Sequence, residues 1–339
     1  MSSPAISVTI VTYNSARFIQ QCLYYVLAQS FKDVEVIVVD NLSSDETPQI
    51  LRGFEGQVQV VYNKENTGFV GGQNQAMELA RGAWILALNP DVRLSPDFLS
   101  SVLAAGKANE QIGTVCGKLL AMQADFKIPE MPVLDSTGIY FTPSLRHFDR
   151  GSKQPDHGQY ETPEYVFGAT GAAALYRREM IEDVSLSSDF FDSDFFAYRE
   201  DADVAWRAQL LGWKCIYTPH ATAYHVRSVL PSNRQSLPAA INMHSVKNRF
   251  LMRINNITAS LYKQHFWAIT SRDVVVVAGC LLREWSSLRA FFIVLRNWRK
   301  SWRKRQEIMR RRRTHDAYMA AWFAPQPISF PATERVASK

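Results

Sequence analysis

The sequence predicts an α/β fold with a mainly parallel sheet and helices on both of its faces. Short apolar bursts rich in valine and isoleucine recur through the N-terminal part, and segments with a helical period separate them. Parallel strands need such crossovers, because each strand has to begin again at the same end of the sheet. Polar residues follow each burst, as expected where ligands bind beyond the carboxyl ends of the strands.

The N-terminal elements follow one another as strand, helix, strand. We expect strands over Ile6–Val11, Val34–Val39, Val58–Tyr62 and Ala83–Leu88, and helices over Ala16–Gln29, Ser44–Gly53 and Gly71–Arg81. The polar segments at the strand ends are Thr12-Tyr13-Asn14, Asp40-Asn41, Asn66-Thr67-Gly68 and Asn89-Pro90-Asp91.

The pattern loosens from Met122 to Tyr165, where we expect a long loop or insertion with one short strand near Ser136–Phe141. Regular structure returns with a strand over Tyr165–Arg178, the segment Phe190–Gly212 and a strand over Lys214–Tyr217. The region from Pro238 to Trp302 has a helical period, with amphipathic segments after Leu237 and after Thr270, and the residues from Pro325 have the composition of a loose tail.

Composition is that of a globular enzyme. The 339 residues are 47% hydrophobic and 12% aromatic, which is enough to bury one large core or two smaller ones. The cysteines are too far apart to indicate disulfides or a zinc site, and they fit a reducing compartment. We expect no secretory signal and no transmembrane helix, because the longest apolar stretches are shorter than the roughly 20 residues that span a bilayer. The expected location is therefore the cytoplasm.

Asp40 stands where a buried strand ends and a helix begins. A carboxylate there can accept hydrogen bonds from a ribose or a base, while Ser43 or Ser44 caps the helix. The alternative is that Asp40 only closes a turn. Asp45 fits a first-turn acid favoured by the helix dipole.

Three glycines between Asn66 and Asn74 precede a predicted helix. Glycine lets a backbone approach a ligand closely, and a helix N-terminus favours phosphate. A plain loop is the alternative explanation of the same glycines.

Asp91 follows an apolar strand and a proline. Mg²⁺ or Mn²⁺ takes one or two protein carboxylates and completes its ligands with substrate phosphates and water. Such an ion offsets the charge that builds up on a departing nucleoside diphosphate. A structural Asp turn is the alternative.

Three acids, Glu200, Asp201 and Asp203, lie at the start of a predicted helix and follow an aromatic run. Aromatic faces stack on sugars, and a carboxylate can take the proton of an acceptor hydroxyl. Asp203 and Arg207 are spaced for a surface ion pair, which we favour for Asp203.

Further candidates lie toward the C-terminus. His225 follows the strand-like segment Ala221–Tyr224 and can hold a metal or a phosphate, although a hydrogen-bonded core histidine is the commoner case. His244, Lys247 and Asn248 share one face of a helix, with Arg249 beside them, and this face can meet phosphates or be solvated.

Positive charge is concentrated between Arg283 and Arg313, where twelve Arg or Lys residues face only Glu284 and Glu307. This local balance of +10 exceeds the net charge of +6. It suits an anionic membrane surface. The alternatives are a solvated helical face or a contact between copies in a homo-oligomer.

Together these segments resemble glycosyltransferase family 2, which has the GT-A fold, and specifically its bacterial rhamnosyltransferase-like branch. The resemblance runs from Val8 to Arg249, with the motifs in the order of the family. The nucleotide-binding half is carried by Thr12-Tyr13-Asn14, Val39-Asp40-Asn41 with Ser43 and Asp45, Asn66 with Gly68-Phe69 and Asn74, and Leu88-Asn89-Pro90-Asp91-Val92. The acceptor and catalytic half is carried by Gly168-Ala169, Arg177-Arg178, the segment from Phe196 to Asp203, and His225.

The resemblance implies an inverting, metal-dependent enzyme that transfers a sugar from a nucleotide-diphosphate donor. It implies that Asp201 is the general base and that Asp91, with His225, holds Mg²⁺ or Mn²⁺. The implied donor contacts are Thr12, Tyr13, Asn14, Asp40, Asn41, Asn66, Gly68, Phe69, Asn74 and Asn89. The candidates for acceptor or phosphate contact are Glu200, Arg207, His244, Lys247 and Arg249. The family commonly has an aspartate where Asn89 stands, which leaves one strong carboxylate ligand.

The same resemblance favours dTDP-rhamnose as donor, with a UDP-hexose or UDP-galactofuranose as alternatives. The expected acceptor is a lipid-linked glycan of cell-surface polysaccharide synthesis, reached by peripheral contact with anionic lipid at the inner face of the cytoplasmic membrane. We divide the chain into a nucleotide-sugar-binding half (1–120), an acceptor and catalytic half (121–235), a basic helical region (236–324) and a tail (325–339).

Other functions fit less well. A sugar nucleotidyltransferase should carry a glycine-rich, basic N-terminal loop, and Thr9–Ala16 has neither glycine nor lysine. A non-catalytic carbohydrate-binding protein does not need both Asp91 and Asp201. We expect no nucleic-acid binding, since Arg310–Arg313 lacks an aromatic platform for bases.

Overall fold

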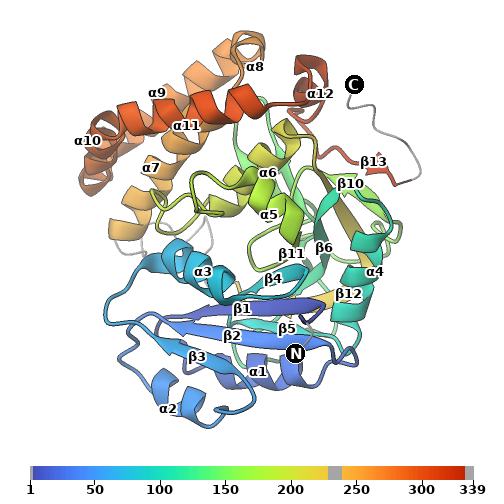
Figure 1. Ribbon diagram of the computed structural model, residues 1–339. Coiled ribbons are helices and arrows are strands. Elements are labelled where there is room, and N and C mark those ends of the chain that lie inside the picture. Colours follow the sequence, from blue (N-terminus) through green and yellow to red (C-terminus); the bar gives the residue numbers. More distant parts are fainter. Residues whose placement is uncertain (1–2, 228–238, 333–339) are drawn as a thin grey trace.

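The centre of the molecule is one twisted mixed sheet with helices on both faces (Figure 1). The computed structural model describes residues 3–227 and 239–332. In this part of the chain the main path of the sheet runs β13-β10-β12-β6-β11-β4-β1-β2-β3. The predicted α/β class with helices on both faces is confirmed.

The N-terminal half follows the predicted order closely. Its strands are β1 (Ile6–Thr12), β2 (Val34–Asp40), β3 (Gln59–Tyr62) and β4 (Trp84–Leu88), and its helices are α1 (Ile19–Leu27), α2 (Thr47–Arg52) and α3 (Gly68–Leu79). All four strands are parallel, with Ile6 opposite both Val34 and Trp84. Their carboxyl ends therefore meet at one edge of the sheet, which we call the ligand edge.

The second half adds antiparallel strands to the same sheet. Its elements are β5 (Val92–Leu94), α4 (Phe98–Lys107), β6 (Ile112–Ala121), β7 (Leu134–Ser136), β8 (Ile139–Phe141), β9 (His147–Asp149), β10 (Glu164–Val166), β11 (Ala173–Arg177), α5 (Arg178–Val184), α6 (Glu200–Leu210) and β12 (Lys214–His225). β11 runs antiparallel between β4 and β6, so its first residue lies at the ligand edge.

Two expectations for this half are wrong. The segment from Tyr165 to Arg178 is not one strand, because β10 pairs with β12 while β11 pairs with β4 and β6. The strand from Lys214 continues to His225, with a shift of register between Thr218 and Thr222. This longer strand carries His225 to the ligand edge.

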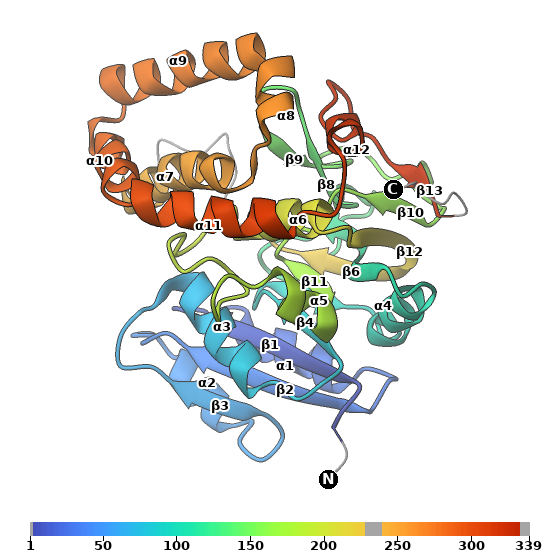
Figure 2. The ribbon, with the colours of Figure 1, turned by 45° about the horizontal axis from the view of Figure 1, so that its top comes forward.

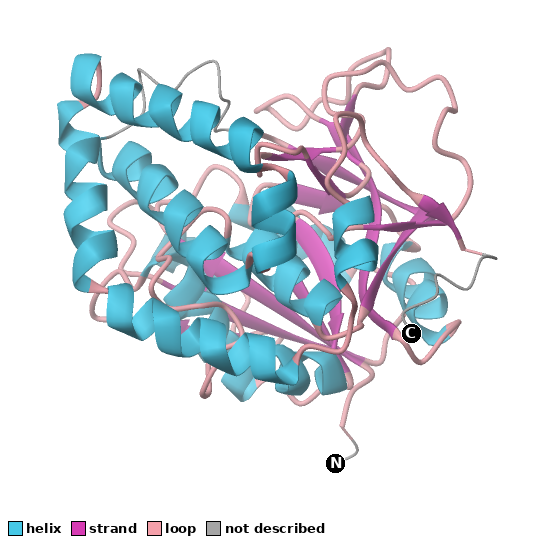
Figure 3. Ribbon diagram, turned by 90° about the horizontal axis from the view of Figure 1, so that it is seen from above, coloured by secondary structure: helices cyan, strands magenta, loops and turns pink. Residues whose placement is uncertain are grey.

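The C-terminal region is a bundle of helices beside the sheet (Figures 2 and 3). It consists of α7 (Ala239–Asn256), α8 (Ala259–Gln264), α9 (Phe266–Leu282), the 3₁₀ helix η2 (Trp285–Leu288), α10 (Arg289–Arg296), α11 (Trp298–Arg311) and α12 (Asp316–Ala321). The expected boundary at 235/236 and the start after Leu237 lie outside the described residues. None of the helices described is both long and apolar enough to span a bilayer.

The last described residues are not a loose tail. β13 (Phe330–Pro331) pairs antiparallel with β10, and the Ser329 hydroxyl donates a hydrogen bond to Glu164 at 2.9 Å. The apolar Phe330 packs between this edge and Trp322, with ring centroids 4.8 Å apart. β13 therefore closes one edge of the sheet.

Each face of the sheet has its own apolar core. Side chains such as Ile6, Ile10 and Leu86 pack on one face of the sheet. Side chains that point the opposite way, such as Ile37 and Ala87, pack on the other face. Alternation along each strand produces both cores, and burial on both sides explains the continuous apolar runs of the sequence.

Candidate active site

Asp91 and His225 meet because of a short strand pairing. Directly after β4, the Asn89 N–H donates to the Ala172 carbonyl at 2.9 Å. Three residues later, Val92 of β5 pairs with His225 of β12. This pairing brings the Asp91 Oδ1 to 3.4 Å from the His225 Nε2. Both residues were expected to act together, and they lie together at the ligand edge.

His225 is held from behind by a chain of charges. Its Nδ1 lies 2.8 Å from the Asp135 Oδ2, and the other Asp135 oxygen accepts a hydrogen bond from the Arg227 Nε at 2.7 Å. Arg227 also pairs with Asp149 at 2.7 Å. Burial opposes protonation of His225, but the contacts with Asp135 and Asp91 outweigh it and raise the pKa to about 9.

Sequence reasoning missed Asp135, Asp149 and Arg227. Asp135 lies in β7 and Asp149 ends β9, both inside the segment that was expected to be mostly irregular. No local pattern marks these acids, because their partner is supplied by β12. A carboxylate behind a histidine fixes the direction of the ring, and this arrangement is common around metal ligands.

Asp91 could hold a divalent cation that is shared with a substrate, with His225 as a second ligand once its Nε2 has lost its proton. The Asp91 Oδ1 is buried and accepts no hydrogen bond within the described part of the chain, so it has room for another partner. No group of three His, Cys, Asp or Glu side chains in residues 3–227 and 239–332 is arranged to hold a metal alone. A cation here would need further ligands from a diphosphate and water, which is typical of Mg²⁺.

Asp201 lies at the same edge, at the start of α6. Its Oδ2 accepts a hydrogen bond from the Gly171 N–H at 2.9 Å, and its Oδ1 accepts one from the Ala202 N–H at 2.7 Å. Gly171 directly precedes Ala172, the partner of Asn89. The hydrogen bond between Asn89 and Ala172 therefore lies between the loop of Asp91 and the carboxylate of Asp201. Burial raises the pKa of Asp201, and the charge of Asp149 adds to this effect.

Glu200 is more deeply buried than Asp201. Its Oε2 makes no hydrogen bond within the described residues, and burial together with the charge of Asp201 raises the pKa of Glu200 to about 8. At neutral pH the Glu200 carboxyl is therefore mostly protonated.

Arg207 departs from the expectation of a phosphate contact or a surface ion pair. It forms an ion pair with Asp203 at 2.9 Å, but both side chains are fully buried. The guanidinium also donates to the carbonyls of Val184 and Phe190, at 2.5 and 2.8 Å. All its polar contacts thus hold α6 against the preceding loop, away from solvent and ligand.

The loop before α6 has an unusual backbone, with positive φ at Phe196 (67°), Tyr198 (71°) and Arg199 (71°). Non-glycine residues adopt this conformation rarely and at some cost. On α7, the Asn248 Nδ2 donates to the carbonyls of Phe195, Ala197 and Tyr198, at 3.0, 2.7 and 2.7 Å. Asn248 thereby holds the backbone that delivers Glu200 and Asp201.

Three expected ligand contacts on α7 have internal partners instead. Lys247 donates to the Asp194 carbonyl, and His244 stacks on Phe196 with ring centroids 4.8 Å apart. Arg249 is buried and lies 3.5 Å from Asp273. Burial lowers the pKa of Lys247 to about 8, as expected for an ammonium removed from water.

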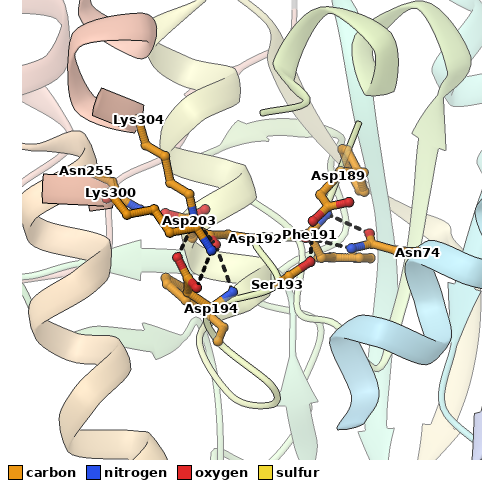
Figure 4. A network of polar contacts seen from close by, with 12 residues as sticks. Asn74, Asp189, Phe191, Asp192, Ser193, Asp194, Asp203, Asn255, Lys300 and Lys304 are labelled. Atoms are coloured by element: carbon orange, nitrogen blue, oxygen red, sulfur yellow. Dashed lines mark hydrogen bonds and ion pairs between the residues drawn. The ribbon is translucent and has the colours of Figure 1, made fainter. Parts of the chain in front are cut away.

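A cluster of acids and lysines fixes the beginning of the loop that leads into α6 (Figure 4). Lys304 on α11 bridges Asp192 and Asp194, both at 2.5 Å, and Lys300 contacts Asp194 at 2.6 Å. Asn74 on α3 exchanges two hydrogen bonds with the backbone of Phe191, at 2.8 and 2.9 Å. The Asn74 amide therefore binds protein, where a donor contact was expected.

The glycines after Asn66 also serve packing. Helix α3 begins at Gly68 and not at Gly71, and the Asn66 side chain accepts the Gly68 N–H at 2.8 Å. Gly68 has a φ of 75°, and a Cβ there would lie 2.5 Å from the Phe196 carbonyl oxygen. The close approach expected of this glycine is real, but the partner is the Phe196 backbone. Phe69 packs edge-on against Phe191, 6.0 Å between centroids.

The remaining expected donor residues lie at the β1–β2 end of the ligand edge, where the nucleotide was expected. Asp40 accepts hydrogen bonds from the Thr12 hydroxyl at 2.8 Å and from the Ser43 hydroxyl at 2.6 Å, so it closes a turn. Asn41 is buried and binds the Gly68 carbonyl at 2.7 Å. Tyr13 and Asn14 are exposed beside them.

The expected cap of α2 is wrong, because Glu46 is at the N-cap position and makes no capping side-chain hydrogen bond. Asp45, and not Ser43 or Ser44, accepts the Thr47 N–H at 3.0 Å. Asp45 also accepts the Ala16 N–H at 3.0 Å, so one carboxylate joins the starts of two helical segments.

The structure thus combines a GT-A-like mixed α/β sheet with acids gathered at its ligand edge. The sequence profile described as Glycosyl transferase family 2 matches residues 7–185, which is more than half of the chain. The protein belongs to glycosyl transferase family 2. This profile describes the whole family and does not distinguish its rhamnosyltransferase-like branch.

Relatives in sequence include bacterial glycosyltransferases. The putative glycosyltransferase EpsH of Bacillus subtilis is 23% identical over 308 residues, covering 88% of this chain and 83% of that protein. A second one from the same organism, the putative teichuronic acid biosynthesis glycosyltransferase TuaG, is 35% identical over 103 residues, covering 30% and 41%. The succinoglycan biosynthesis protein ExoO of Rhizobium meliloti is 31% identical over 140 residues, covering 39% and 40%.

Solved structures show the same GT-A fold at low sequence identity. The mannosyltransferase PcManGT of Pyrobaculum calidifontis, in complex with GDP-Man and Mn²⁺, has a TM-score of 0.52 at 18% identity and covers 95% of this chain and 88% of its own. GalNAc-T7 with UDP, GalNAc and Mn²⁺ has a TM-score of 0.60 at 14% identity, with 77% and 50% covered.

Proposed function

We propose that this glycosyltransferase inverts the anomeric carbon of a nucleotide-diphosphate sugar in a single displacement. The observation that carries the proposal is the pair Asp91 and Asp201, which lie on either side of the Asn89–Ala172 pairing at the ligand edge. Two acids at one edge serve two tasks: one lies where a leaving diphosphate needs charge compensation, and the other can accept a proton.

Asp201 acts as the general base in this proposal. Its carboxylate takes the proton of an acceptor hydroxyl, the hydroxyl oxygen attacks the anomeric carbon, and the nucleoside diphosphate leaves from the opposite face. The amides of Gly171 and Ala202 fix the orientation of the carboxylate. A raised pKa makes it a stronger base than an exposed aspartate.

Asp91 and His225 hold the diphosphate end. Mg²⁺ or Mn²⁺ bound there would offset the negative charge that develops on the leaving group. Asp135 keeps the Nε2 of His225 directed at Asp91. The Mn²⁺ in the two complexes described above supports the metal, as a property of those proteins.

The sugar is proposed from the resemblance. dTDP-rhamnose is the first choice of donor, and a UDP-hexose or UDP-galactofuranose is the alternative. Tyr13 and Asn14 are exposed at the β1–β2 end of the ligand edge and, with Thr12 and Asp40, are the proposed contacts of the nucleoside. Relatives named for teichuronic acid and succinoglycan biosynthesis support a role in polysaccharide synthesis.

We place the reaction at the cytoplasmic face of the membrane, with a lipid-linked glycan as acceptor. The basic region was expected to provide the attachment by charge alone. Several of its cations have internal partners, however: Lys300 and Lys304 bind the acidic loop, and Arg313 pairs with Asp183 at 2.8 Å. Charge is therefore only part of any contact with lipid.

The test is a panel of nucleotide sugars with the purified protein, with and without Mg²⁺ or Mn²⁺. We expect one donor to raise the melting temperature in the presence of metal and to be hydrolysed slowly without acceptor. Stabilisation by a donor that persists in EDTA would remove the metal and leave His225 as the group that contacts the diphosphate. Release of pyrophosphate from a nucleoside triphosphate and a sugar phosphate would instead indicate a nucleotidyltransferase.

A further inference from the structure

Helix α9 presents most of its apolar side chains to solvent. Among its 17 residues only Ile269 and Cys280 are buried. Trp267, Val274 and Leu281 are exposed and are spaced seven residues apart, which places them on one stripe of the helix. A mainly apolar helix with so little burial has a large surface that water solvates poorly.

The exposed apolar surface continues past α9. It includes η2, α10 and the start of α11, at the end of the helical bundle that lies away from the N-terminal strands (Figure 2). We call it the α9–α11 face, and its large exposed side chains are Trp267, Val274, Val275, Leu281, Leu282, Trp285, Phe292, Leu295, Trp298 and Trp302. Trp298 and Trp302 stack with centroids 5.8 Å apart.

Exposed arginines accompany these side chains. On α10, Arg289, Phe292 and Arg296 follow at helical spacing, so a phenylalanine that is 74% exposed lies between two guanidinium groups. With the residues that the structure describes, none of the following arginines forms an ion pair: Arg283, Arg289, Arg296, Arg299 and Arg303. They differ in this from Lys304 and Arg313, which have acidic partners inside the protein.

We propose that the α9–α11 face docks on an anionic lipid bilayer. Tryptophan and arginine suit the boundary between headgroups and acyl chains, where aromatic bodies are buried and guanidinium groups meet lipid phosphates. A second copy of this chain fits the face less well, because a symmetric contact would bring its unpaired arginines against one another.

The opposite side of α9 connects this face to the acceptor half of the enzyme. Asp273 pairs with Arg253 and lies 3.5 Å from Arg249, both on α7. Arg249 in turn donates to the Ser144 carbonyl, between β8 and β9, at 3.3 Å. Contacts through α9 and α7 thus link the α9–α11 face to the β8–β9 hairpin. This arrangement suits an acceptor carried by a lipid, a point that rests on the proposed function.

The experiment is flotation of the full chain with vesicles of phosphatidylcholine alone or mixed with phosphatidylglycerol. We expect the protein to float with the anionic vesicles only. Trp267→Ser with Leu282→Ser should weaken partitioning at least about ten-fold, because two exposed apolar side chains are lost. Arg289→Ala with Arg296→Ala should weaken it about 25-fold at low salt, at about five-fold per arginine.

Matched controls are exposed residues that do not belong to this face. Met131→Ser removes an apolar side chain and Arg52→Ala a cation, and both should leave flotation within about two-fold. The proposal is rejected if the parent protein stays with the soluble fraction or if both double variants float as well as the parent. It is also rejected if light scattering without lipid shows a dimer that Trp267→Ser with Leu282→Ser converts to a monomer.

Donor hydrolysis in lipid-free buffer separates this proposal from the function on which it partly rests. The two double variants should hydrolyse donor as the parent does, because none of the four residues lies at the ligand edge. Flotation without any donor hydrolysis in the parent would overturn the proposed function and leave the docking surface established.

Discussion

The two ends of the ligand edge differ in how completely their polar atoms are used. At the β1–β2 end, Asp40, Thr12 and Ser43 bond with one another, and Asn41 binds backbone. At the other end, one oxygen each of Asp91 and Glu200 is buried with no hydrogen bond in the described part of the chain. Polar groups that bond with one another fix the shape of a loop. Buried polar atoms without a hydrogen bond indicate where a ligand or a proton can bind.

The largest effect that we expect is the loss of turnover in Asp201→Asn. The amide keeps the shape of the side chain but cannot accept a proton, so we expect turnover to fall about 10²–10⁴-fold while donor binding is kept. Single-turnover transfer and calorimetric donor titration measure the two quantities. Glu200→Gln is the matched control, because it resembles the protonated form and should keep most activity. The reverse result would move the base to Glu200.

The next effect is on stability and concerns a closed network. Arg207→Ala leaves Asp203 buried without its cation, and we expect the free energy of unfolding to fall by about 3–5 kcal/mol. Urea denaturation measures this change. Arg81→Ala, which breaks the exposed pair with Glu35, should cost at most about 1 kcal/mol. Equal losses for the two variants would mean that the Asp203–Arg207 pair is not sequestered from water.

A smaller effect is expected for Asp135, the carboxylate that contacts His225. Asp135→Asn weakens the support of His225, and we expect metal affinity to fall about 10–100-fold, as for other carboxylates that orient a metal-binding histidine. The melting temperature as a function of Mn²⁺ concentration, at fixed donor, measures it. Asp125→Asn, in the same insertion but exposed, should leave the titration unchanged. An unchanged titration in Asp135→Asn would separate the metal from His225.

The smallest effect is a change in pH dependence. The pKa of Glu200 is raised from its ordinary value to about 8, so the folded state holds a proton that the unfolded chain releases near pH 4.5. Its contribution to stability is therefore complete below pH 4.5 and is lost as the pH rises toward 8. Glu200→Gln should make unfolding less sensitive to pH between 5 and 8. A parent and variant with parallel pH profiles would contradict the raised pKa.

Much of the N-terminal half could be predicted, because its information is local. The alternation of apolar and β-branched residues marked β1, β2 and β4 almost to the residue, and the polar segments after them do lie at one edge. The meeting of Asp91 and His225 came only from the family resemblance, since strands that far apart in the chain carry no shared pattern.

The rest depends on tertiary contacts that a single sequence does not display. The surroundings of Asp135 depend on β12, and Arg207 is buried only because the loop of Phe190 covers it. The basic run looked like one charged surface, although Lys300 and Lys304, on successive turns of one face of α11, point inward to Asp192 and Asp194. Glycine spacing suggested a phosphate cradle at Gly68, where the Phe196 backbone lies instead.

The single amide of Asn248 has a consequence for attempts to exchange parts between related enzymes. It bonds three carbonyls within the short segment Phe195–Tyr198, where Phe196 and Tyr198 have positive φ, and it does so from a helix outside the residues matched by the family profile. A chimera that keeps the sheet but imports a foreign helical bundle should therefore retain this asparagine. Without it, the segment would relax and carry its two acids out of alignment.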